Sequence, residues 1–281
     1  MKNCSIIGFL TDFGQVDPYV GICKAVIAAI NQHSTVIDIS HEVTPQDILQ
    51  AAFYLKAAAP SFPDGSIILA VVDPGVGSHR APIVVENGAH CLVGPDNGIF
   101  DLIMKKDAHT YKIDHEKLKL ALCQRKITVH ESHTFHARDI FAPAAALISI
   151  GMSPLGFCTP IETPPKRLKF PVAKAKEHYI QGAIFHFDRF GNAATNISTE
   201  ELGLLACKNR YIEVTIFKKD GTKIVVPFGQ TFSSVPDCLP VSYINSFGLL
   251  EIAVNKGNAQ KALGLHIGDM VKLTCNLGQI S

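Results

Sequence analysis

The sequence has little that would suit a nucleic-acid-binding surface. Trp is absent from all 281 residues, charged residues make up only 18%, and the formal net charge is +1. The densest basic stretch is Lys166-Arg167 with Lys169 nearby, and the aromatic residues are not interleaved with basic ones. A nucleic-acid surface requires a concentrated positive field. The composition therefore argues against nucleic acid as a partner.

Long apolar runs and paired cysteine motifs are also missing. The longest apolar stretches, such as residues 141–150, are far shorter than the roughly 20 residues that a membrane-spanning helix needs. The first apolar run, residues 5–10, is followed at once by an acidic residue, so neither a signal peptide nor a membrane partner is expected. The eight cysteines form no CxxC pair, which predicts buried free thiols in a reducing, cytoplasmic environment.

What the sequence does contain is enough apolar residues, 47%, for a sizeable core, and enough length for two domains. Strand-like and helix-like segments alternate in the first half. Strands are expected at residues 5–10, 35–39, 66–72, 83–86 and 91–93, and helices at 19–30, 44–59, 100–105 and 138–150. Asp17 is the expected N-cap of the first helix, and Pro143 either kinks the last helix or marks its first turn. This order predicts a mostly parallel sheet covered by helices.

The second half changes character after a proline-rich segment, which predicts a linker. Beyond it, strands are expected at residues 178–187, 210–217, 223–227, 249–254 and 270–277. Asp220-Gly221 is a typical hairpin turn. We therefore expect an α/β N-terminal domain at residues 1–160, a linker at 161–176, and a smaller all-β, barrel-like C-terminal domain at 177–281.

Two acidic residues follow apolar strands in the first half. Asp12 comes after the first strand and Asp73 after the third, and ligands of open parallel sheets bind at such carboxyl ends. The alternative is that both are ordinary cap or turn residues. Asp73 begins the octet DPGVGSHR, whose glycines allow a ligand to approach the backbone closely. A dinucleotide loop is disfavoured because Arg80 stands where a third glycine is needed.

Residues 129–139 hold three histidines and two acids, which leaves two interpretations open. His130, His133, His136 and Asp139 include the ligand types that zinc or iron uses, but the HExxH pattern is absent. The other interpretation is that His136 handles protons, because the pKa of an imidazole lies near neutral pH. Asp139 then caps the following helix, and the other two histidines are loop residues.

Two loops of the second half are candidate ligand loops. In the segment DRFGNAATN (188–196), Phe190 offers an aromatic face for a planar base, and Asn192 can both donate and accept hydrogen bonds. Ser246, in the segment NSFG (245–248), is able to bind a carboxylate. For both loops the alternative is a plain polar turn.

Taken together, these segments resemble one family. The segments are LTDFG (10–14) with Asp17, DPGVGSHR (73–80), GPDNG (94–98), TFHARDIFAP (134–143), DRFGNAATNI (188–197) and INSFGLLEIAVNKGNA (244–259). They are similar to the S-adenosylmethionine (SAM) hydrolases, also called SAM hydroxide adenosyltransferases, which are relatives of the fluorinase and chlorinase enzymes. The match runs in order along almost the whole chain.

The resemblance implies hydrolysis of S-adenosyl-L-methionine to adenosine and L-methionine, by in-line attack of an activated water at the ribose 5′ carbon. It implies an Asp-Arg-His triad at Asp73, Arg80 and His136, with neither a cofactor nor a metal ion. It also implies a homotrimer, with each site between the N-terminal domain of one subunit and the C-terminal domain of its neighbour.

Substrate contacts also follow from the resemblance. Asp12 is the expected partner of the ribose diol, Asp17 and Asp188 those of the methionine amine, and Ser246 that of the methionine carboxylate. The purine contacts fall on Phe190, Asn192 and the strand from Glu251 to Val254.

The chain departs from its halogenating relatives at the triad. Those relatives carry a tyrosine at the position of Asp73 and a tyrosine-serine pair at the positions of His136-Ala137. An acidic residue at position 73 repels halide, so halogenation is disfavoured. The hydrolases usually have Gly at position 137, and Phe247 stands where some relatives have a polar residue, next to the expected methionine carboxylate.

Two other function classes remain open. The first is a protein that binds SAM or adenosine without turnover, although a sensor has no need for the triad. The second is a metal-dependent hydrolase that uses His130, His133, His136 and Asp139.

Overall fold

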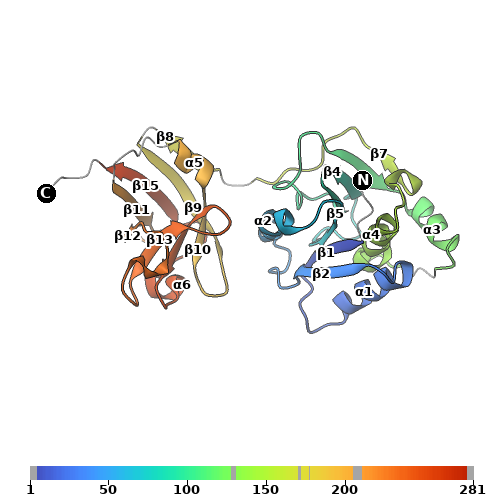
Figure 1. Cartoon of the computed structure of the whole chain (residues 1–281), viewed down its shortest axis with the longest axis horizontal. Helices are drawn as coiled ribbons and strands as arrows, with labels where there is room; N and C mark the ends of the chain where they lie inside the picture. The colour runs from blue at the N-terminus through green and yellow to red at the C-terminus, as the bar shows by residue number, and fades with distance from the viewer. Residues whose placement is uncertain (1–4, 128–130, 170–171, 177, 205–210, 277–281) are drawn as a thin grey trace. The chain divides into compact units, whose positions relative to one another are not determined.

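The computed structural model describes residues 5–127, 131–169, 172–176, 178–204 and 211–276 (Figure 1). The chain divides into two compact units, residues 1–169 and 170–281. Residues 161–169, which the sequence suggested as part of a linker, belong to the first unit. The backbone N–H of Lys166 donates to Asp96 over 2.8 Å, and that of Leu168 donates to Asp101 over 2.9 Å.

The first unit is built on a seven-stranded sheet of order β2-β1-β3-β5-β4-β6-β7. Its strands are β1 (Ile6–Thr11), β2 (Thr35–Ser40), β3 (Ile67–Val71), β4 (Pro82–Asn87), β5 (His90–Pro95), β6 (His109–Ile113) and β7 (Cys158–Pro160). Strand β1 pairs in parallel with β2 and β3, and β3 with β5, whereas β4, β6 and β7 pair antiparallel. The α/β class is confirmed. The sheet is mixed because only Gly88 and Ala89 separate β4 from β5, too few residues for a parallel crossover.

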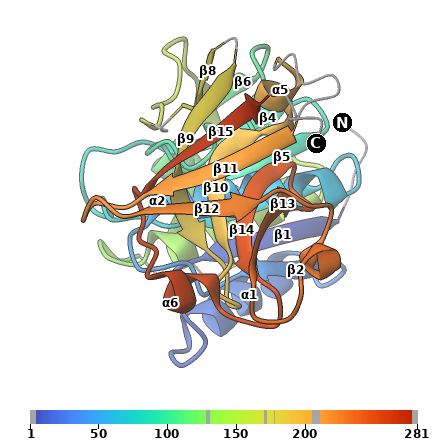
Figure 2. The same ribbon diagram turned by 90° about the vertical axis from the view of Figure 1, so that its left-hand side faces the viewer.

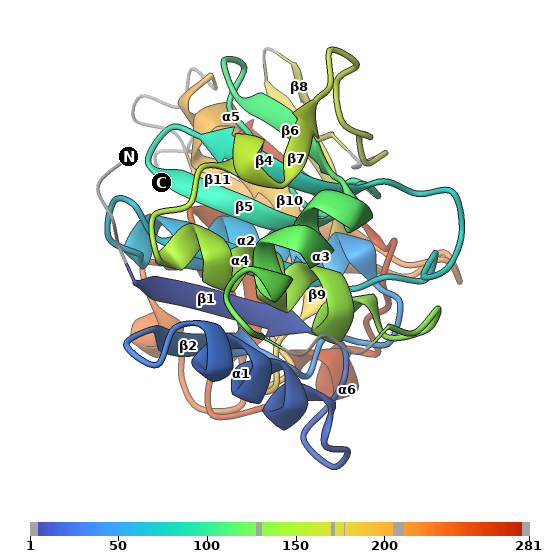
Figure 3. The ribbon, with the colours of Figure 1, turned by 90° about the vertical axis from the view of Figure 1, so that its right-hand side faces the viewer.

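Helices cover both faces of this sheet. They are α1 (Tyr19–Ile30), α2 (Ile48–Ala58), α3 (His115–Cys123) and α4 (Ala142–Ser149), with the short helices η1 (Ala59–Ser61), η2 (Ala137–Phe141) and η3 (Pro154–Gly156). Ile67, Leu69 and Val71 of β3 pack in one core with α1, α3 and α4, while Ile68 and Ala70 pack in a second core with α2. Figure 3 shows α1, α3 and α4 on the near side of the sheet. The strand is buried on both faces, as its unbroken apolar run predicts.

Local signals at helix ends were partly misleading. Asp47 caps α2 by accepting from the N–H of Gln50, but α1 has Pro18 at its N-cap without any side-chain cap, so the prediction for Asp17 is wrong. Pro143 lies in the first turn of α4, which decides between the two alternatives for it. The helix expected at residues 100–105 is absent, because residues 99–103 form turns.

The second unit is an eight-stranded antiparallel sheet (Figure 2). Its strands are β8 (Lys174–Lys176), β9 (Tyr179–Phe187), β10 (Ala193–Ser198), β11 (Tyr211–Phe217), β12 (Lys223–Pro227), β13 (Pro240–Ile244), β14 (Leu249–Val254) and β15 (Met270–Asn276), and its helices are α5 (Thr199–Gly203), η4 (Phe232–Ser234) and α6 (Ala259–Leu263). The main path runs β12-β11-β15-β9-β10-β14-β13, and β8 adds to β9. A bridge between Phe228 and Ser242 joins the two ends of the path, so the sheet is nearly a closed barrel.

Thiol burial differs from the expectation for some cysteines. Cys23, Cys91 and Cys158 are buried and free, and burial raises the pKa of Cys23 and of Cys158 to about 12, which makes these thiols unreactive. Cys123 and Cys238 are free but exposed. Cys275 is disulfide-bonded, contrary to the prediction of free thiols throughout.

Within the described part of the chain, no helix is long and apolar enough to cross a bilayer.

Candidate active site

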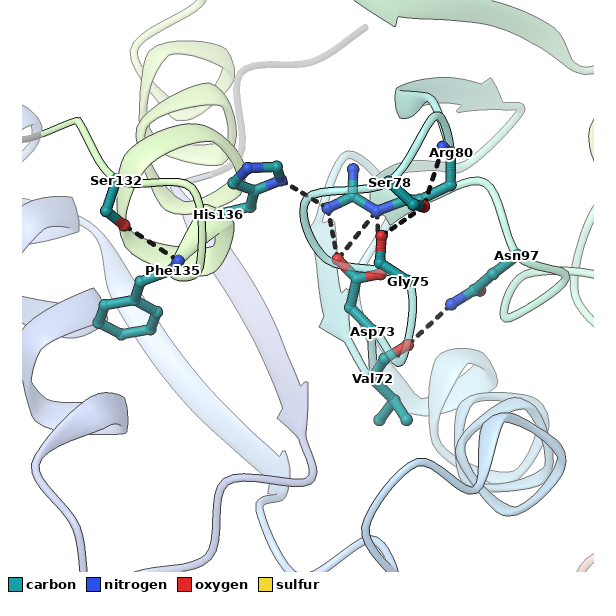
Figure 4. Close-up of polar contacts among 9 residues, drawn as sticks. All are labelled: Val72, Asp73, Gly75, Ser78, Arg80, Asn97, Ser132, Phe135 and His136. Carbon is teal, nitrogen blue, oxygen red and sulfur yellow. Dashed lines mark hydrogen bonds and ion pairs between the residues drawn. The ribbon is translucent and has the colours of Figure 1, made fainter.

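Asp73, Arg80 and His136 form one connected group in the first unit (Figure 4). The Arg80 Nε lies 2.9 Å from both carboxylate oxygens of Asp73, and its Nη2 also donates to Oδ2. The same Nη2 lies 2.7 Å from Nδ1 of His136. A single guanidinium therefore bridges a carboxylate that follows β3 and an imidazole that precedes η2.

The loop from Asp73 to Arg80 folds back on itself through two successive turns. The N–H of Val76 donates to the carbonyl of Asp73, and the N–H and hydroxyl of Ser78 donate to the carbonyl of Gly75. Gly77 adopts φ +78°, and a Cβ there would lie 3.0 Å from the carbonyl oxygen of His133. Glycine is required because any side chain would be strained and would push away the segment that carries His136.

The carboxylate and guanidinium are shielded from water. The side chains of Arg80 and Asp73 are 5% and 6% exposed, and the Arg80 Cζ lies 5.1 Å from the centre of the Phe141 ring. Charges in such a site interact more strongly than in water, and each would be strongly destabilising without its partner.

His136 has its proton position set by Arg80. A guanidinium only donates, so Nδ1 accepts and the neutral ring carries its proton on Nε2. Figure 4 shows the second ring nitrogen pointing away from Arg80. Burial, followed by the charge of Arg80, lowers the pKa of His136 below its ordinary value of 6.5. The neutral form is therefore the form of this ring at neutral pH.

Asn97, from the GPDNG segment, supports the strand end that carries Asp73. Its side-chain amide donates to the carbonyl of Val72 over 2.8 Å, and its Oδ1 accepts from the N–H of Ile99. The sequence indicated this segment only as a family motif and suggested no role for Asn97. Its role depends on a contact between residues 25 positions apart, which no local pattern reveals.

Asp12 lies at the same edge of the sheet as Asp73, because Thr11 of β1 pairs with Val71 of β3. Its Oδ2 accepts from the backbone N–H of Gln46 over 2.8 Å. The placement matches the expectation that acidic residues gather at the carboxyl ends of these strands. Asp17 is exposed in the segment before α1.

An aromatic cluster connects the Asp12 turn to the His136 segment. The Phe13 ring centre lies 5.8 Å from that of Tyr19 and 6.1 Å from that of Phe135, and the Tyr19 and Phe135 centres are 5.2 Å apart. Sequence reasoning did not single out this cluster. It packs the loop after β1 against the residue that precedes His136, and so holds the two parts of the site together.

The predicted residues of the loop between β9 and β10 lie in the second unit. The Asp188 carboxylate accepts from the N–H groups of Phe190 and Asn192 and from the Asn192 side-chain amide, over 2.8–2.9 Å. Asp188 therefore orders its own loop. Asn192 is buried, whereas Phe190 is 75% exposed.

Glu251 connects the second candidate loop to the barrel. Its two carboxylate oxygens accept from the Tyr243 hydroxyl over 2.5 Å and from the Asn245 amide over 2.8 Å. Ser246, next to Asn245, is exposed. The side chain of Val254 belongs to the hydrophobic core of the barrel, so it is not available to a ligand.

The histidine-rich segment does not assemble into a ligand cluster where it is described. His130 lies outside the described residues. The Asp139 carboxylate accepts from the N–H and hydroxyl of Ser132 and from Arg138, so it anchors the preceding loop instead of capping the helix. His133 and His136 line a cavity of about 350 Å³ beside α3. Among the residues that the structure describes, no group of three His, Cys, Asp or Glu side chains has a metal-binding arrangement.

Comparisons with known proteins cover both units. The SAM hydroxide adenosyltransferase N-terminal domain matches residues 7–157, and the corresponding C-terminal domain matches residues 182–272. A protein of Thermus thermophilus named (R)-S-adenosyl-L-methionine hydrolase is 39% identical over 94% of this chain and 98% of its own length. A protein of Actinopolyspora mzabensis named fluorinase is 22% identical over 96% of this chain and 97% of its own.

A solved structure is also similar. The crystal structure of an uncharacterized conserved protein from Thermotoga maritima aligns with a TM-score of 0.84 and 32% identity, and covers 95% of this chain and 99% of that one. Domain matches, full-length relatives and fold agree with the motifs that surround Asp73, Arg80 and His136. The chain therefore belongs to the SAM hydroxide adenosyltransferase family.

Proposed function

We propose that this protein hydrolyses (R)-S-adenosyl-L-methionine to adenosine and L-methionine by attack of water on the ribose 5′ carbon. The observation that carries the proposal is the shielded group of Asp73, Arg80 and His136 beside Asp12. Relatives that match almost the whole chain are named as hydrolases of this substrate, which supports the same reaction.

In this reaction the leaving group needs no activation, whereas the nucleophile does. The sulfonium departs as a neutral thioether, so no acid is needed at sulfur. Water is a poor nucleophile towards carbon and must approach in line with the C–S bond. Holding it in that position is worth about 7–11 kcal/mol in favourable cases. The charge of the sulfonium is also neutralised as the bond to oxygen forms, which a dry pocket favours.

The hydrogen bonds of the triad suggest how the water is held. His136 Nδ1 already accepts from Arg80, so this nitrogen is not available to accept from the water. Each Asp73 oxygen has further lone pairs beyond those that Arg80 engages. We therefore assign the role of acceptor for the water proton to Asp73. Arg80 stabilises the hydroxide-like oxygen, and His136 fixes the guanidinium. The reaction turns one sulfonium cation and one water into adenosine, methionine and one proton, which finally leaves to solvent.

Substrate recognition is divided between the two units. In the first unit, Asp12 accepts from both ribose hydroxyls, a bidentate arrangement that a carboxylate favours. Asp17 binds the methionine amine. In the second unit, Asp188 also binds this amine, and Ser246 binds the methionine carboxylate.

The purine contacts come from Phe190, Asn192 and strand β14, with Val254 contributing its backbone and Glu251 supporting the strand through Tyr243 and Asn245. We propose that the protein is a homotrimer. The two sets of residues then meet across a subunit boundary.

A product assay tests the reaction. Incubation with SAM and EDTA is expected to yield adenosine and methionine in equal amounts, measured by chromatography. Tight binding of SAM with no adenosine after long incubation would favour a binding protein instead. Activity that EDTA abolishes and added zinc or iron restores would favour the metal-dependent hydrolase.

The pH dependence of turnover tests the role of His136. We expect kcat to be constant near neutral pH and to fall on the acid side, with an inflection below 6.5, because protonation places a proton on Nδ1 that faces the Arg80 guanidinium. The other charged neighbours of this ring are Asp73, His115 and Asp139.

The variant His136→Asn offers an amide oxygen to Arg80 without titrating, and its acid limb is expected to flatten. An inflection well above 6.5 in the wild type, or an unchanged acid limb in the variant, would contradict this role.

A further inference from the structure

His41 lies buried behind the turn that carries Asp12. It follows β2 and is 1% exposed. Its Nδ1 lies 2.8 Å from the Thr11 hydroxyl, and its backbone carbonyl accepts from the N–H of Gly14 over 2.8 Å. One residue therefore contacts both ends of the turn from Thr11 to Gly14. Asp12 lies between these two contacts.

The protons of this group have one consistent arrangement. Nε2 of His41 lies 3.1 Å from Asp38 Oδ1, so this ring nitrogen faces the carboxylate, although the geometry is not that of a well-formed hydrogen bond. Lys24 donates to the other Asp38 oxygen over 2.7 Å, and burial opposes ionisation of Asp38 while the contacts with Lys24 and His41 lower its pKa overall. An ionised carboxylate only accepts, so Nε2 carries the proton and Nδ1 accepts from the Thr11 hydroxyl.

The Thr11 hydroxyl oxygen also accepts a hydrogen bond from the backbone of the same turn. The backbone N–H of Phe13 lies 3.3 Å from Thr11 Oγ1. Hydrogen-bond donors and acceptors thus run in one direction, from Phe13 through Thr11 to His41, whose Nε2 faces the Asp38 carboxylate. Burial lowers the pKa of His41 below 6.5, although the Asp38 carboxylate opposes the shift. The neutral ring that this chain requires is therefore also the form that burial favours.

The connection that begins at His41 holds the Asp12 carboxylate as well. Gln46, whose N–H donates to Asp12 Oδ2, has φ +69°, an unusual conformation for a residue other than glycine. The segment between β2 and α2 therefore fixes the turn through His41 and one carboxylate oxygen through Gln46.

We propose that His41 is a positioning residue for Asp12, and that its neutral form with the proton on Nε2 holds the turn in which Asp12 meets the two ribose hydroxyls. The inference rests on the proposed function for the identity of the ligand. Hydrogen bonds to the ribose exist both in the bound substrate and in the transition state. Loosening the turn is therefore expected to raise KM and to leave kcat nearly unchanged.

Nitrogen NMR of the imidazole rings tests the proton arrangement without any ligand. In wild-type protein at pH 7, the His41 signals are expected to show an unprotonated Nδ1 and a protonated Nε2. The signals are assigned to His41 by their loss in His41→Asn. A proton on Nδ1 at pH 7, or a rapidly exchanging ring, would overturn the proposal. The protonation state is read from the intact wild-type chain, and the variant serves only to assign the signals.

Ligand binding tests the consequence for Asp12. Thr11→Val removes the hydroxyl at nearly constant volume, Thr11→Ser retains it, and Lys24→Gln alters only the exposed end of the chain of contacts. Calorimetry with adenosine is expected to show binding about tenfold weaker in Thr11→Val and within about twofold of wild type in the other two. Binding of 2′,3′-dideoxyadenosine, which lacks both hydroxyls, is expected to be the same in all four proteins.

The dideoxy ligand separates positioning from general damage. If Thr11→Val weakens the binding of both nucleosides equally, His41 and Thr11 merely support the fold and the proposal fails. If the four proteins show the expected affinities for both nucleosides but the wild type releases no adenosine from SAM, the hydrolase proposal fails while the positioning role stands. If adenosine binds equally well to Thr11→Val and wild type, the positioning role fails whatever the turnover.

Discussion

Asp73→Asn is expected to bind SAM with nearly wild-type affinity but to hydrolyse it at least about 10²-fold more slowly. The amide keeps the shape of the side chain, but it has no charge and only one acceptor oxygen. Its NH₂ group would face an Arg80 guanidinium that donates to both oxygens of Asp73 in the wild type. Loss of a positioned base typically reduces a rate by about 10²–10⁴-fold. The measurements are kcat by adenosine release and SAM affinity by calorimetry.

Asp64→Asn is a matched control, because the same chemical change is made at an exposed residue of the first unit. It is expected to leave kcat, KM and SAM affinity unchanged. Turnover by Asp73→Asn within a factor of ten of wild type would remove Asp73 from the role of base. The water would then be activated chiefly by its position.

Arg80→Met is expected to lower the free energy of unfolding by about 3–5 kcal/mol and to abolish turnover. It leaves the Asp73 carboxylate, 6% exposed, without its cation, and breaking a buried ion pair from one side has a destabilising effect of this size. His136 also loses the donor to its Nδ1. Chemical denaturation at pH 7 measures the first effect and adenosine release the second. Arg80→Lys retains the charge but not the planar guanidinium that reaches both Asp73 and His136. Its free energy of unfolding and its turnover are therefore expected to lie between those of wild type and Arg80→Met.

The double variant Arg80→Met/Asp73→Leu separates folding from catalysis. Replacing both charges with apolar side chains removes the unpaired carboxylate, so stability is expected to recover by several kcal/mol while turnover stays absent. If Arg80→Met is destabilised by less than about 1 kcal/mol, water reaches the pair in solution and the site is wetter than its geometry indicates. Exclusion of water could then not contribute to catalysis.

Much of the secondary structure was predictable from local patterns. The expected strands at residues 223–227 and 249–254 coincide with β12 and β14, because continuous β-branched and apolar runs between turns specify strands locally. Strands β6, β7, β8, β10 and β13 and helices α3, α5 and α6 were missed. Helix α3 mixes charged and apolar residues and buries Leu118, Ala121 and Leu122, and its start depends on Asp114 accepting from two backbone N–H groups. Such short elements of mixed polarity are stabilised by their neighbours, which a local pattern does not contain.

The candidate site was also only partly predictable from the sequence. Motif order indicated Asp73, Arg80 and His136, and strand order placed Asp12 beside Asp73. Motif spacing does not predict the direction of hydrogen bonds between residues 56 positions apart, such as Arg80 and His136. The contact that sets the proton on Nε2 of His136, and so favours Asp73 as the acceptor of the water proton, is visible only in the folded chain.

By itself the sequence determined the two-domain α/β and β-barrel architecture, the family motifs and the residue types of the site, because these depend on local periodicity and on short segments. The tertiary structure alone decided how those residues are held: Asn97 on the carbonyl of Val72, and His41 on the hydroxyl of Thr11. These supports join residues 25 and 30 positions apart. Their existence depends on how the strands and loops pack in three dimensions, and a buried polar group leaves no periodic signal in the chain.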